Sequence, residues 1–294
     1  MVWAVLGAFL FAFMFMLPKL VSGAVPPQQV AFLRYFAGFL TILPFFLGSY
    51  GPAQGLAEIT APAKRRLNLM HALRASCGVA SVAFGTYAVT HIPLANAQAI
   101  AMTNGVFAVA LAAVFLGEKV SARDIAAGLF CLAGAIIVAG PDPSAPSWIS
   151  LGALAALVQA FAWGSEVVLL RFAAVNDTPQ RTLTLVNGSA CLGLALFTAW
   201  SWNRLPLPDL AILLAMGPVA IVGQYCNIRA FKVAETAKLV PIKYSGLVFA
   251  ALLGLVFFDE WPRPAAIAGA VMICSGAIYL ARHKPVQTVA RLRP

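Results

Sequence analysis

The chain is a series of long apolar runs separated by short segments rich in proline, glycine and charged residues. A helix that crosses the hydrocarbon core of a bilayer needs about 20 consecutive, predominantly apolar residues. We predict a membrane-spanning helix wherever a run of that kind occurs. The ten predicted spans are residues 3–23, 29–48, 70–90, 94–116, 123–140, 148–170, 183–202, 208–230, 236–258 and 263–281.

The linkers between these spans are mostly short and carry residues that end helices. Pro26-Pro27 lies between the first two spans, and Gly140-Pro141-Asp142-Pro143 follows the fifth. One longer linker, residues 49–69, contains Lys64-Arg65-Arg66 and is expected to be a loop. The last residues, 283–294, are expected to form a short basic tail in the cytoplasm.

The second half of the chain repeats the first. Residues 95–139 align with residues 237–281 at a constant shift of 142, with 15 of the 45 positions identical. The identities include Glu118 and Glu260, which end an apolar run in both copies. The preceding spans align in the same way at a shift of 152. A duplicated block of membrane helices is typical of transporters built from internal repeats.

On this basis we predict two domains, residues 1–140 and residues 148–282, each with five membrane helices. Because five is an odd number, the chain enters the second domain from the opposite side of the membrane. The predicted fold class is therefore an all-α polytopic membrane protein. Its ten transmembrane helices would form two inverted five-helix repeats about a pseudo-two-fold axis in the membrane plane.

Composition agrees with a membrane protein. Of the 294 residues, 61% are hydrophobic and 10% are charged, whereas about 25% of the residues in soluble domains are charged. A net charge of +10 would favour a nucleic-acid partner if the protein were soluble. Here the basic residues lie mostly in linkers and the tail. Membrane topology explains them, and we expect no nucleic-acid partner.

The basic residues also predict the orientation in the membrane. With the N-terminus inside, 14 of the 20 lysines and arginines fall on the inner side, and the outer linkers hold only Arg204 and Arg263. Cytoplasmic loops carry such an excess of Lys and Arg. We therefore expect a multi-pass protein of the inner or plasma membrane with both termini in the cytoplasm.

The sequence lacks the motifs that are typical of enzymes. The cysteines form no C-x-x-C pair and fall inside apolar runs, as expected of small buried side chains. The histidines lack metal-ligand spacing, and the nucleophile-elbow, zinc-protease and P-loop motifs do not occur. The sequence therefore predicts a protein that is not an enzyme and has no catalytic residue, metal or cofactor.

Ionisable side chains within the spans are the first candidates for a functional site, because such groups are costly in a membrane and usually face a cavity or a partner. Glu166 is the one carboxylate clearly inside a span, and Lys243 and Arg74 lie at a similar depth. We expect Glu166 to hold a coupling proton or cation, and Arg74 and Lys243 to attract a carboxylate or phosphate. The alternative is a structural Glu166–Lys243 ion pair, with Arg74 snorkelling inward.

Two further cations and a proline have simpler explanations. Lys19 and Arg34 lie nearer to the outer surface, and their side chains are long enough for snorkelling to be the favoured explanation. Pro241 precedes Lys243 and Tyr244 in the ninth span. A proline there is consistent with a broken helix beside the site or with ordinary helix curvature.

Polar and aromatic residues near the middle of the spans complete the candidate substrate site. Such groups suit a polar small molecule, whereas packing and hydrogen bonding between helices are the alternative. The set comprises Trp163, Asn104, Tyr244, Thr103, Gln224, Tyr225 and Tyr87. We expect the substrate where the two copies differ in mid-membrane, as at Asn104 opposite Gly246 and at Ala101 opposite Lys243.

Short motifs recur along the chain in a characteristic order. They are His91-Ile92-Pro93-Leu94-Ala95-Asn96-Ala97, Phe115-Leu116-Gly117-Glu118-Lys119, Phe161-Ala162-Trp163-Gly164-Ser165, Val240-Pro241-Ile242-Lys243-Tyr244 and Phe257-Phe258-Asp259-Glu260. Together they resemble the drug/metabolite transporter superfamily, specifically the ten-helix group with two EamA domains, over about residues 3–282. Two positions depart from the pattern. Phe11-Ala12-Phe13 stands where a tryptophan-glycine signature is usual, and Asp259 replaces the usual glycine.

The resemblance implies a carrier of small metabolites with two inverted five-helix bundles around a central cavity. Because no ATP-binding motif is present, we expect a secondary transporter that works by alternating access. The basic in-span residues favour a substrate with a carboxylate, such as an amino acid or a related compound. The alternative is a pore-like facilitator or another membrane protein that is not a carrier.

The expected partners are a small-molecule metabolite and the lipid bilayer. Small residues at 126–128 and 268–270 would pack either two copies of the chain into a homodimer or two helices within one copy. Both possibilities stay open at the level of sequence.

Overall fold

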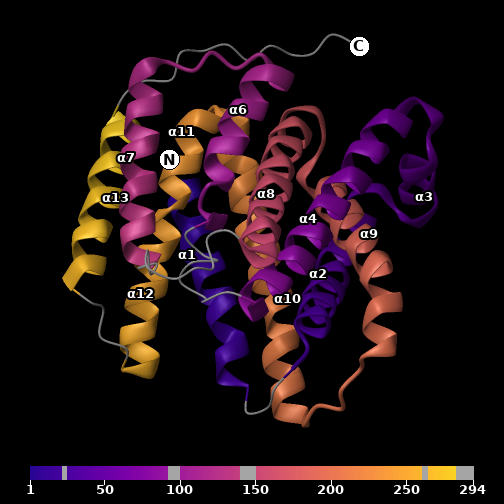
Figure 1. Cartoon of the computed structure of the whole chain (residues 1–294). Coiled ribbons are helices and arrows are strands. Elements are labelled where there is room, and N and C mark those ends of the chain that lie inside the picture. The colour runs from indigo at the N-terminus through magenta and orange to yellow at the C-terminus, as the bar shows by residue number, and fades with distance from the viewer. Residues whose placement is uncertain (22–24, 92–99, 140–149, 260–263, 283–294) are drawn as a thin grey trace.

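The computed structural model describes residues 1–21, 25–91, 100–139, 150–259 and 264–282, and Figure 1 shows their arrangement. Within these ranges all regular structure is helical. The α-helices are α1 (Val2–Met16), α2 (Pro27–Tyr50), α3 (Pro52–Thr60), α4 (Arg65–His91), α6 (Asn104–Leu116), α7 (Ala122–Ala139), α8 (Leu151–Asn176), α9 (Pro179–Trp200), α10 (Leu207–Val233), α11 (Thr236–Lys243), α12 (Ser245–Phe258) and α13 (Pro264–Arg282), and the 3-10 helices are η1 (Leu17–Leu20) and η2 (Pro62–Lys64).

Each predicted span overlaps with at least one helix that the structure describes. In five places these helices are long and apolar enough to cross a membrane: α2, α8, α9, α10, and α11 with α12 taken together. The predicted span 236–258 is divided between α11 and α12, and the predicted span 3–23 between α1 and η1. The start of the predicted span 94–116, the linker after residue 139 and the tail from residue 283 lie outside the described residues.

Residues 49–69 were expected to be a loop and instead contain a helix. Helix α3 and the turn η2 both begin with a proline, Pro52 and Pro62. Proline suits the first helical position because the N–H it lacks would have no partner there. Gly51, with a φ of 73°, turns the chain between α2 and α3. Glycine adopts this left-handed conformation without steric strain.

The bounds of the helices repeat along the chain. Both ends of α4 and α10 are displaced by 142 residues, and so are the ends of α6 and α12, at Leu116 and Phe258. Helices α2 and α9 begin at Pro27 and Pro179, which are 152 residues apart. These are the two shifts at which the sequence repeats, so the duplicated sequence folds into duplicated helices.

Helices α7 and α13 run antiparallel and contact each other through matching residues (Figure 1). A Cβ atom on Gly134 would lie 2.8 Å from the backbone oxygen of Gly269 and 2.9 Å from Met272. A Cβ atom on Gly276 would meet Phe130, Cys131 and Ala127. Subtracting 142 from Gly269 and Met272 gives Ala127 and Phe130, so the two sets of contacts are reciprocal. Reciprocal contacts arise when two copies of one unit are related by a two-fold axis.

This contact also shows where part of the small-residue faces at 126–128 and 268–270 lies. Ala127 and Gly269 pack against the opposite helix of the same chain, with Gly276 and Gly134 respectively. Helices α7 and α13 therefore use these residues within one copy of the protein. Gly134 and Gly276 are needed at this contact because only a residue without a Cβ atom allows the two helices to come so close.

Large apolar side chains cover the outer faces of the helices. Trp200 is 95% exposed, and Leu196 and Val114 are also exposed along α9 and α6. Such a surface would be unfavourable in water, since a soluble protein rarely exposes a large contiguous apolar area. The exposed apolar faces fit contact with lipid chains, as expected for a multi-pass membrane protein.

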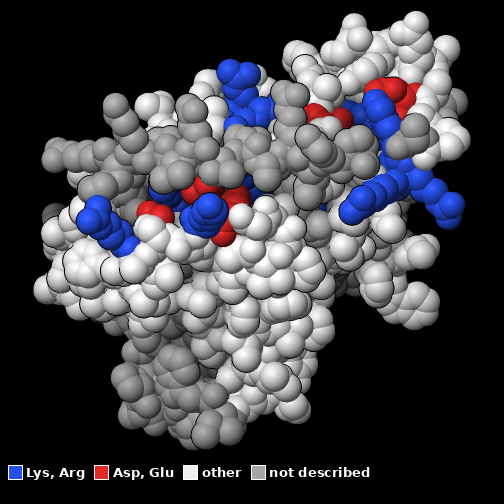
Figure 2. All heavy atoms as spheres, turned by 90° about the horizontal axis from the view of Figure 1, so that it is seen from above, with Lys and Arg blue, Asp and Glu red and all other residues white. Residues whose placement is uncertain are grey.

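Charged side chains gather at one end of the bundle. Figure 2 looks onto the end at which α3 lies in Figure 1, where Lys and Arg are spread with fewer Asp and Glu. Lys64, Arg65 and Arg66 belong to the segment between α3 and α4 at this end. This is the end that the sequence predicts to face the cytoplasm.

Two corresponding helix ends adopt the left-handed conformation. Gly117 follows α6 with a φ of 63°, and Asp259 follows α12 with a φ of 53°. The positions are 142 residues apart. The same left-handed turn therefore ends the helix in both copies. In the second copy Asp259 stands in place of the usual glycine, and its conformation is less favourable for a residue with a Cβ atom.

We expect Asp259→Gly to stabilise the protein by about 1 kcal/mol, because glycine relieves the left-handed strain at the end of α12. Asp259→Asn is the control for the lost charge and should change little. The reverse exchange, Gly117→Asp, should destabilise the protein by a similar amount. Thermal unfolding in detergent measures all three. An unfolding midpoint that falls in Asp259→Gly would contradict this explanation.

Candidate functional site

The ninth predicted span is interrupted beside the candidate site. Helix α11 contains Pro241 and ends at Lys243, and α12 begins at Ser245. At Tyr244 the backbone N–H bonds to the carbonyl oxygen of Pro241, three residues earlier, which tightens the turn. The backbone of Tyr244 stays in the right-handed helical region, with φ −63° and ψ −18°, so the interruption beside Pro241 is a single tightened turn.

The first copy has a matching interruption. Before α6, the backbone N–H of Thr103 bonds to the carbonyl oxygen of Ile100, again three residues earlier. The Tyr244 hydroxyl donates a hydrogen bond of 2.9 Å to the carbonyl oxygen of Met102. Met102 and Tyr244 are 142 residues apart, so each occupies the position of the other in the repeat. The hydrogen bond joins the two interruptions where the copies meet.

An ion pair between α4 and α8 lies inside the bundle. Nη2 of Arg74 is 3.5 Å from Oε1 of Glu166, and the two side chains are 2% and 24% exposed. Nε and Nη1 of Arg74 are buried without a hydrogen-bond partner among the described residues. A buried guanidinium with a single long contact is poorly satisfied. The arrangement therefore leaves donors free for an additional anionic group.

Lys243 lies close enough to this pair to interact electrostatically with Glu166 and Arg74. Its Nζ atom is 5.7 Å from the centre of the Phe231 ring. The alternative prediction of a Glu166–Lys243 ion pair, with Arg74 snorkelling inward, is therefore wrong in its pairing: Glu166 contacts Arg74. A sequence gives the depth of each residue in the membrane but not which neighbouring helix it faces.

Arg34 and Tyr35 extend the cluster onto α2. The Arg34 guanidinium carbon lies 4.5 Å from the centre of the Tyr35 ring and 6.0 Å from that of Phe11. Nε of Arg34 is buried without a partner among the described residues. Snorkelling of the partly exposed Arg34 to the outer surface stays a prediction. Its guanidinium lies over aromatic rings, where a cation is favoured, and Tyr35 was not singled out by the sequence.

The repeat mates of the charged residues are all apolar. The position of Arg74 is taken by Met216 in the second copy, and that of Glu166 by Met14 in the first. Met14 and Met216 lie together in a buried hydrophobic cluster with Leu17, Leu33 and Leu213. The same shifts place Val186 opposite Arg34 and Ala101 opposite Lys243. The charged cluster, built from residues of both copies, therefore occupies one of two corresponding positions in the duplicated frame, and apolar side chains occupy the other.

Three aromatic candidates share one hydrophobic cluster. Tyr244 belongs to it, and Trp163 and Tyr225 pack against it while partly exposed. Tyr225 also meets the ring of Trp3 edge to face, at 6.3 Å between ring centres. On the same helix as Tyr225, Gln224 is buried and its Oε1 atom has no partner among the described residues.

Thr103 and Asn104 use their side chains locally. The Thr103 hydroxyl donates to the carbonyl oxygen of Ile100, and Nδ2 of Asn104 donates to that of Ala101. The Thr103 hydroxyl shares the Ile100 oxygen with the backbone N–H of Thr103, and Asn104 binds the carbonyl of the next residue in the same turn. These contacts indicate that the side chains of Thr103 and Asn104 stabilise the turn before α6.

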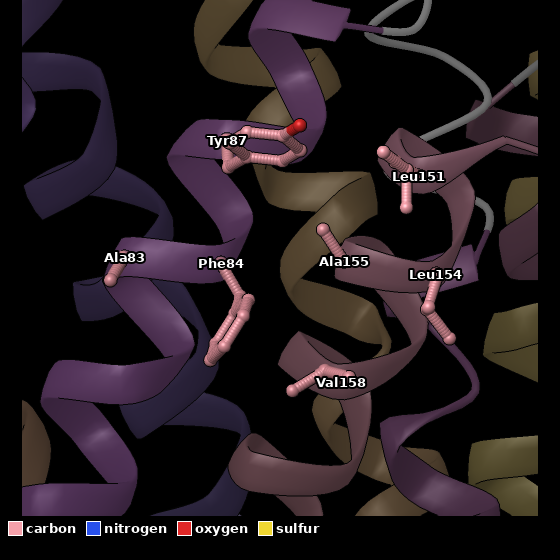
Figure 3. A pocket seen from close by; sticks show the side chains of 7 residues that line it. All are labelled: Ala83, Phe84, Tyr87, Leu151, Leu154, Ala155 and Val158. Atoms are coloured by element: carbon pink, nitrogen blue, oxygen red, sulfur yellow. The ribbon is translucent and has the colours of Figure 1, made fainter.

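Tyr87 lies apart from the other candidates, at the far end of α4 from Arg74. It is 41% exposed and stacks on His91, with 3.9 Å between ring centres. It lines a pocket of about 400 Å³ between α4 and α8, together with Phe84 and Leu154 (Figure 3). The described side chains around this pocket are all apolar or aromatic, so none of them carries a charge with which to bind an anionic substrate.

Glu118 joins three elements at the charged end of the bundle. Its Oε1 atom accepts a bond of 3.0 Å from Nε of Arg171, and its Oε2 atom accepts one of 2.8 Å from the backbone N–H of Thr236. The carboxylate therefore sits at the N-terminus of α11, where a negative charge is favoured by the helix dipole. The predicted scaffold role of this repeated glutamate fits these contacts; its mate Glu260 lies outside the described residues.

A second buried network lies at the junction of α4, α8 and α9. Oδ2 of Asp177 is 2.8 Å from Nε2 of His71 and 2.5 Å from Nη1 of Arg181. Burial acts to raise the pKa of the Asp177 carboxyl, but the hydrogen bond from His71 and the charge of Arg181 outweigh it. The pKa therefore lies below its ordinary value, and the carboxylate is charged at neutral pH.

Comparison with known proteins identifies related chains. Residues 1–140 and 150–282 match the model of the EamA-like transporter family. The pseudopaline exporter CntI of Pseudomonas aeruginosa is 30% identical over 96% of this chain and 95% of that protein. A riboflavin transporter of Brucella anthropi is 23% identical over 88% of this chain and 89% of that protein. A solved structure with 23% identity matches the fold with a TM-score of 0.76 over 95% of this chain and 94% of that one.

We expect Asp177→Asn to destabilise the protein by about 3–5 kcal/mol at pH 7, because it leaves the buried charge of Arg181 without the carboxylate with which it pairs. A carboxyl whose pKa is lowered by folding stabilises the folded state above its unfolded pKa of about 3.9, and the effect is lost as the pH falls through the folded value. The difference between wild type and variant should therefore persist from pH 7 to about pH 5 and shrink below about pH 4.

Thermal unfolding across this pH range measures the difference. The matched control is Asp259→Asn, which removes an exposed carboxylate and should track the wild type at every pH. A gap between wild type and Asp177→Asn that stays constant down to pH 3 would show that the charge of Asp177 is not what stabilises the junction.

Proposed function

The chain belongs to the EamA-like transporter family, and from this premise we propose that it is a secondary carrier that works by alternating access. Its substrate would be a small organic metabolite with a carboxylate, an amino acid or a related compound. The family match confirms the resemblance inferred from the motifs and the prediction of a transporter and not an enzyme. The relatives carry names with different substrates, so the proposed substrate class rests on the residues of this chain.

The observation that carries the proposal is the incompletely satisfied Arg74–Glu166 pair. Arg74 is 2% exposed, has one contact of 3.5 Å to Glu166, and keeps two donors without a partner among the described residues. Lys243 adds a second positive charge nearby. A buried excess of positive charge is costly unless an anion neutralises it. A substrate carboxylate that binds Arg74 and Lys243 would supply that anion.

Glu166 would couple transport to a proton. While ionised, it neutralises Arg74 in the empty carrier and competes with the substrate carboxylate for the same guanidinium. Protonation of Glu166 would remove the competing charge and free Arg74 for substrate. A proton bound at Glu166 and a carboxylate bound at Arg74 would then favour one another, which is the reciprocity that coupled transport needs.

The repeated structure would supply the conformational change. We propose ten membrane-spanning segments in two inverted repeats, residues 1–140 and 148–282, with both termini in the cytoplasm. Support comes from helix bounds that recur at shifts of 142 and 152 and from the reciprocal contacts of α7 and α13. Exchanging the conformations of two inverted halves interconverts inward-open and outward-open states.

Counterflow in liposomes tests the carrier. Purified protein should take up labelled amino acids severalfold faster when the lumen holds unlabelled amino acid, because a carrier returns faster when loaded. A pore-like facilitator shows no such stimulation. If a broad amino-acid panel is inactive while another class of metabolite is moved with stimulation, the carrier stands and the substrate class is wrong.

Glu166→Gln should keep counterflow but lose accumulation driven by a pH gradient, since the amide cannot release a proton. Arg74→Gln should reduce uptake at least tenfold, because one charge-assisted contact contributes about 1.5–3 kcal/mol. Arg66→Gln on the same helix removes an exposed arginine and should leave uptake unchanged. Accumulation by Glu166→Gln that equals the wild type would rule out the proton role.

A further inference from the structure

Two arginines of the site carry donors that the protein leaves unused. Nε and Nη1 of Arg74 and Nε of Arg34 are buried, and none has a hydrogen-bond partner among the described residues. A guanidinium presents five N–H donors in a fixed plane and stays charged at any accessible pH. Buried donors without partners are rare in proteins and need an explanation. Here they belong to two neighbouring cations of one cluster.

A continuous set of contacts connects the two arginines. The Arg34 guanidinium lies over the Tyr35 ring at 4.5 Å. A Cβ atom on Gly78 would lie 3.1 Å from the Tyr35 hydroxyl oxygen and 3.8 Å from the carboxyl carbon of Glu166. Tyr35 and Glu166 therefore flank Gly78, one helical turn beyond Arg74. Arg34 and Arg74 also interact electrostatically. The two cations thus border one region between α2, α4 and α8.

The charges of this region do not balance. Arg34, Arg74 and Lys243 supply three positive charges, and Glu166, which is protonated when substrate binds in the proposed function, then supplies no negative charge. A substrate with a single carboxylate would leave two of these positive charges without a counter-charge in a low-dielectric site, which is strongly unfavourable. A second anionic group would neutralise one more of them and occupy the free donors.

Resting on the proposed function, we infer that the substrate is a small molecule with two anionic groups and that Arg34 binds the second one. Arg74 and Lys243 bind the first group, and Arg34, which lies over the Tyr35 ring, selects molecules with two anionic groups over molecules with one. The planar guanidinium suits a carboxylate or phosphate in a two-point contact. Val186 stands at the corresponding position of the second copy, so the duplicated frame does not require an arginine here.

The test compares ligands that differ by one anionic group. Purified protein is titrated with glutamate, aspartate, 2-aminoadipate and phosphoserine, each beside a counterpart that has the same ammonium group and one anionic group fewer: glutamine, asparagine, 2-aminoadipate monoamide and serine. Ligand binding raises the unfolding temperature by mass action. At least one ligand with two anionic groups should bind about tenfold more tightly than its counterpart, as one charge-assisted contact implies.

In Arg34→Gln this preference should vanish, while binding of the counterpart with one anionic group fewer stays unchanged. Arg34→Lys, which keeps the charge but loses the planar fork, should retain part of the preference and guards against misfolding of the glutamine variant. Arg229→Gln is the matched control, because Arg229 is exposed and makes the same kind of contact with the rings of Trp3 and Tyr225. It should keep the full preference.

The inference is wrong if no ligand with two anionic groups binds more tightly than its counterpart, or if Arg34→Gln keeps the preference. A protein that shows counterflow stimulation with any of the counterparts and lacks a preference for the second anionic group contradicts this inference and leaves the carrier intact. A protein without stimulated counterflow for any compound contradicts the proposed function instead.

Discussion

The close approach of α7 and α13 is the contact from which the rest of the arrangement follows. Gly134 packs on Gly269, and its mate Gly276 packs on Ala127, so each helix presents the same surface to the other. Lipid provides no hydrophobic driving force between helices, so close packing of small residues has to hold them together. The same two-fold relation brings Tyr244 onto the carbonyl oxygen of Met102. It thereby joins the two helix interruptions beside the candidate site.

The site departs from that symmetry. Two corresponding positions of the duplicated frame carry different groups: the Arg74–Glu166 pair at one, and their buried repeat mates Met216 and Met14 at the other. Charge in the membrane is expensive and therefore usually functional, whereas apolar packing serves the scaffold. The position with the charged pair is therefore the one at which we propose that an anion binds.

Much of this fold was predictable from the sequence, because the apolar runs and the repeat shift already locate the helices. Pro27 and Pro179 begin corresponding helices as the shift requires. The helix at residues 52–60 was not predicted, because so short a helix at the end of the bundle contains no long apolar run that would indicate it. The contact between Arg74 and Glu166 was not predicted either, since the one ion pair considered for Glu166 was with Lys243. Depth along a span can be counted from sequence, but the face that a side chain presents depends on how the helices pack.

The central claim is that the two halves are inverted copies in the membrane, and side-specific labelling tests it most directly. Ala122 and Pro264 are repeat mates that begin α7 and α13, and both are exposed. Single cysteines at these positions, in a variant without the native cysteines, are labelled with a membrane-impermeant maleimide in vesicles of each orientation. The account predicts that the two cysteines react from opposite sides, with residue 122 on the cytoplasmic side. Reaction of both from the same side would contradict it.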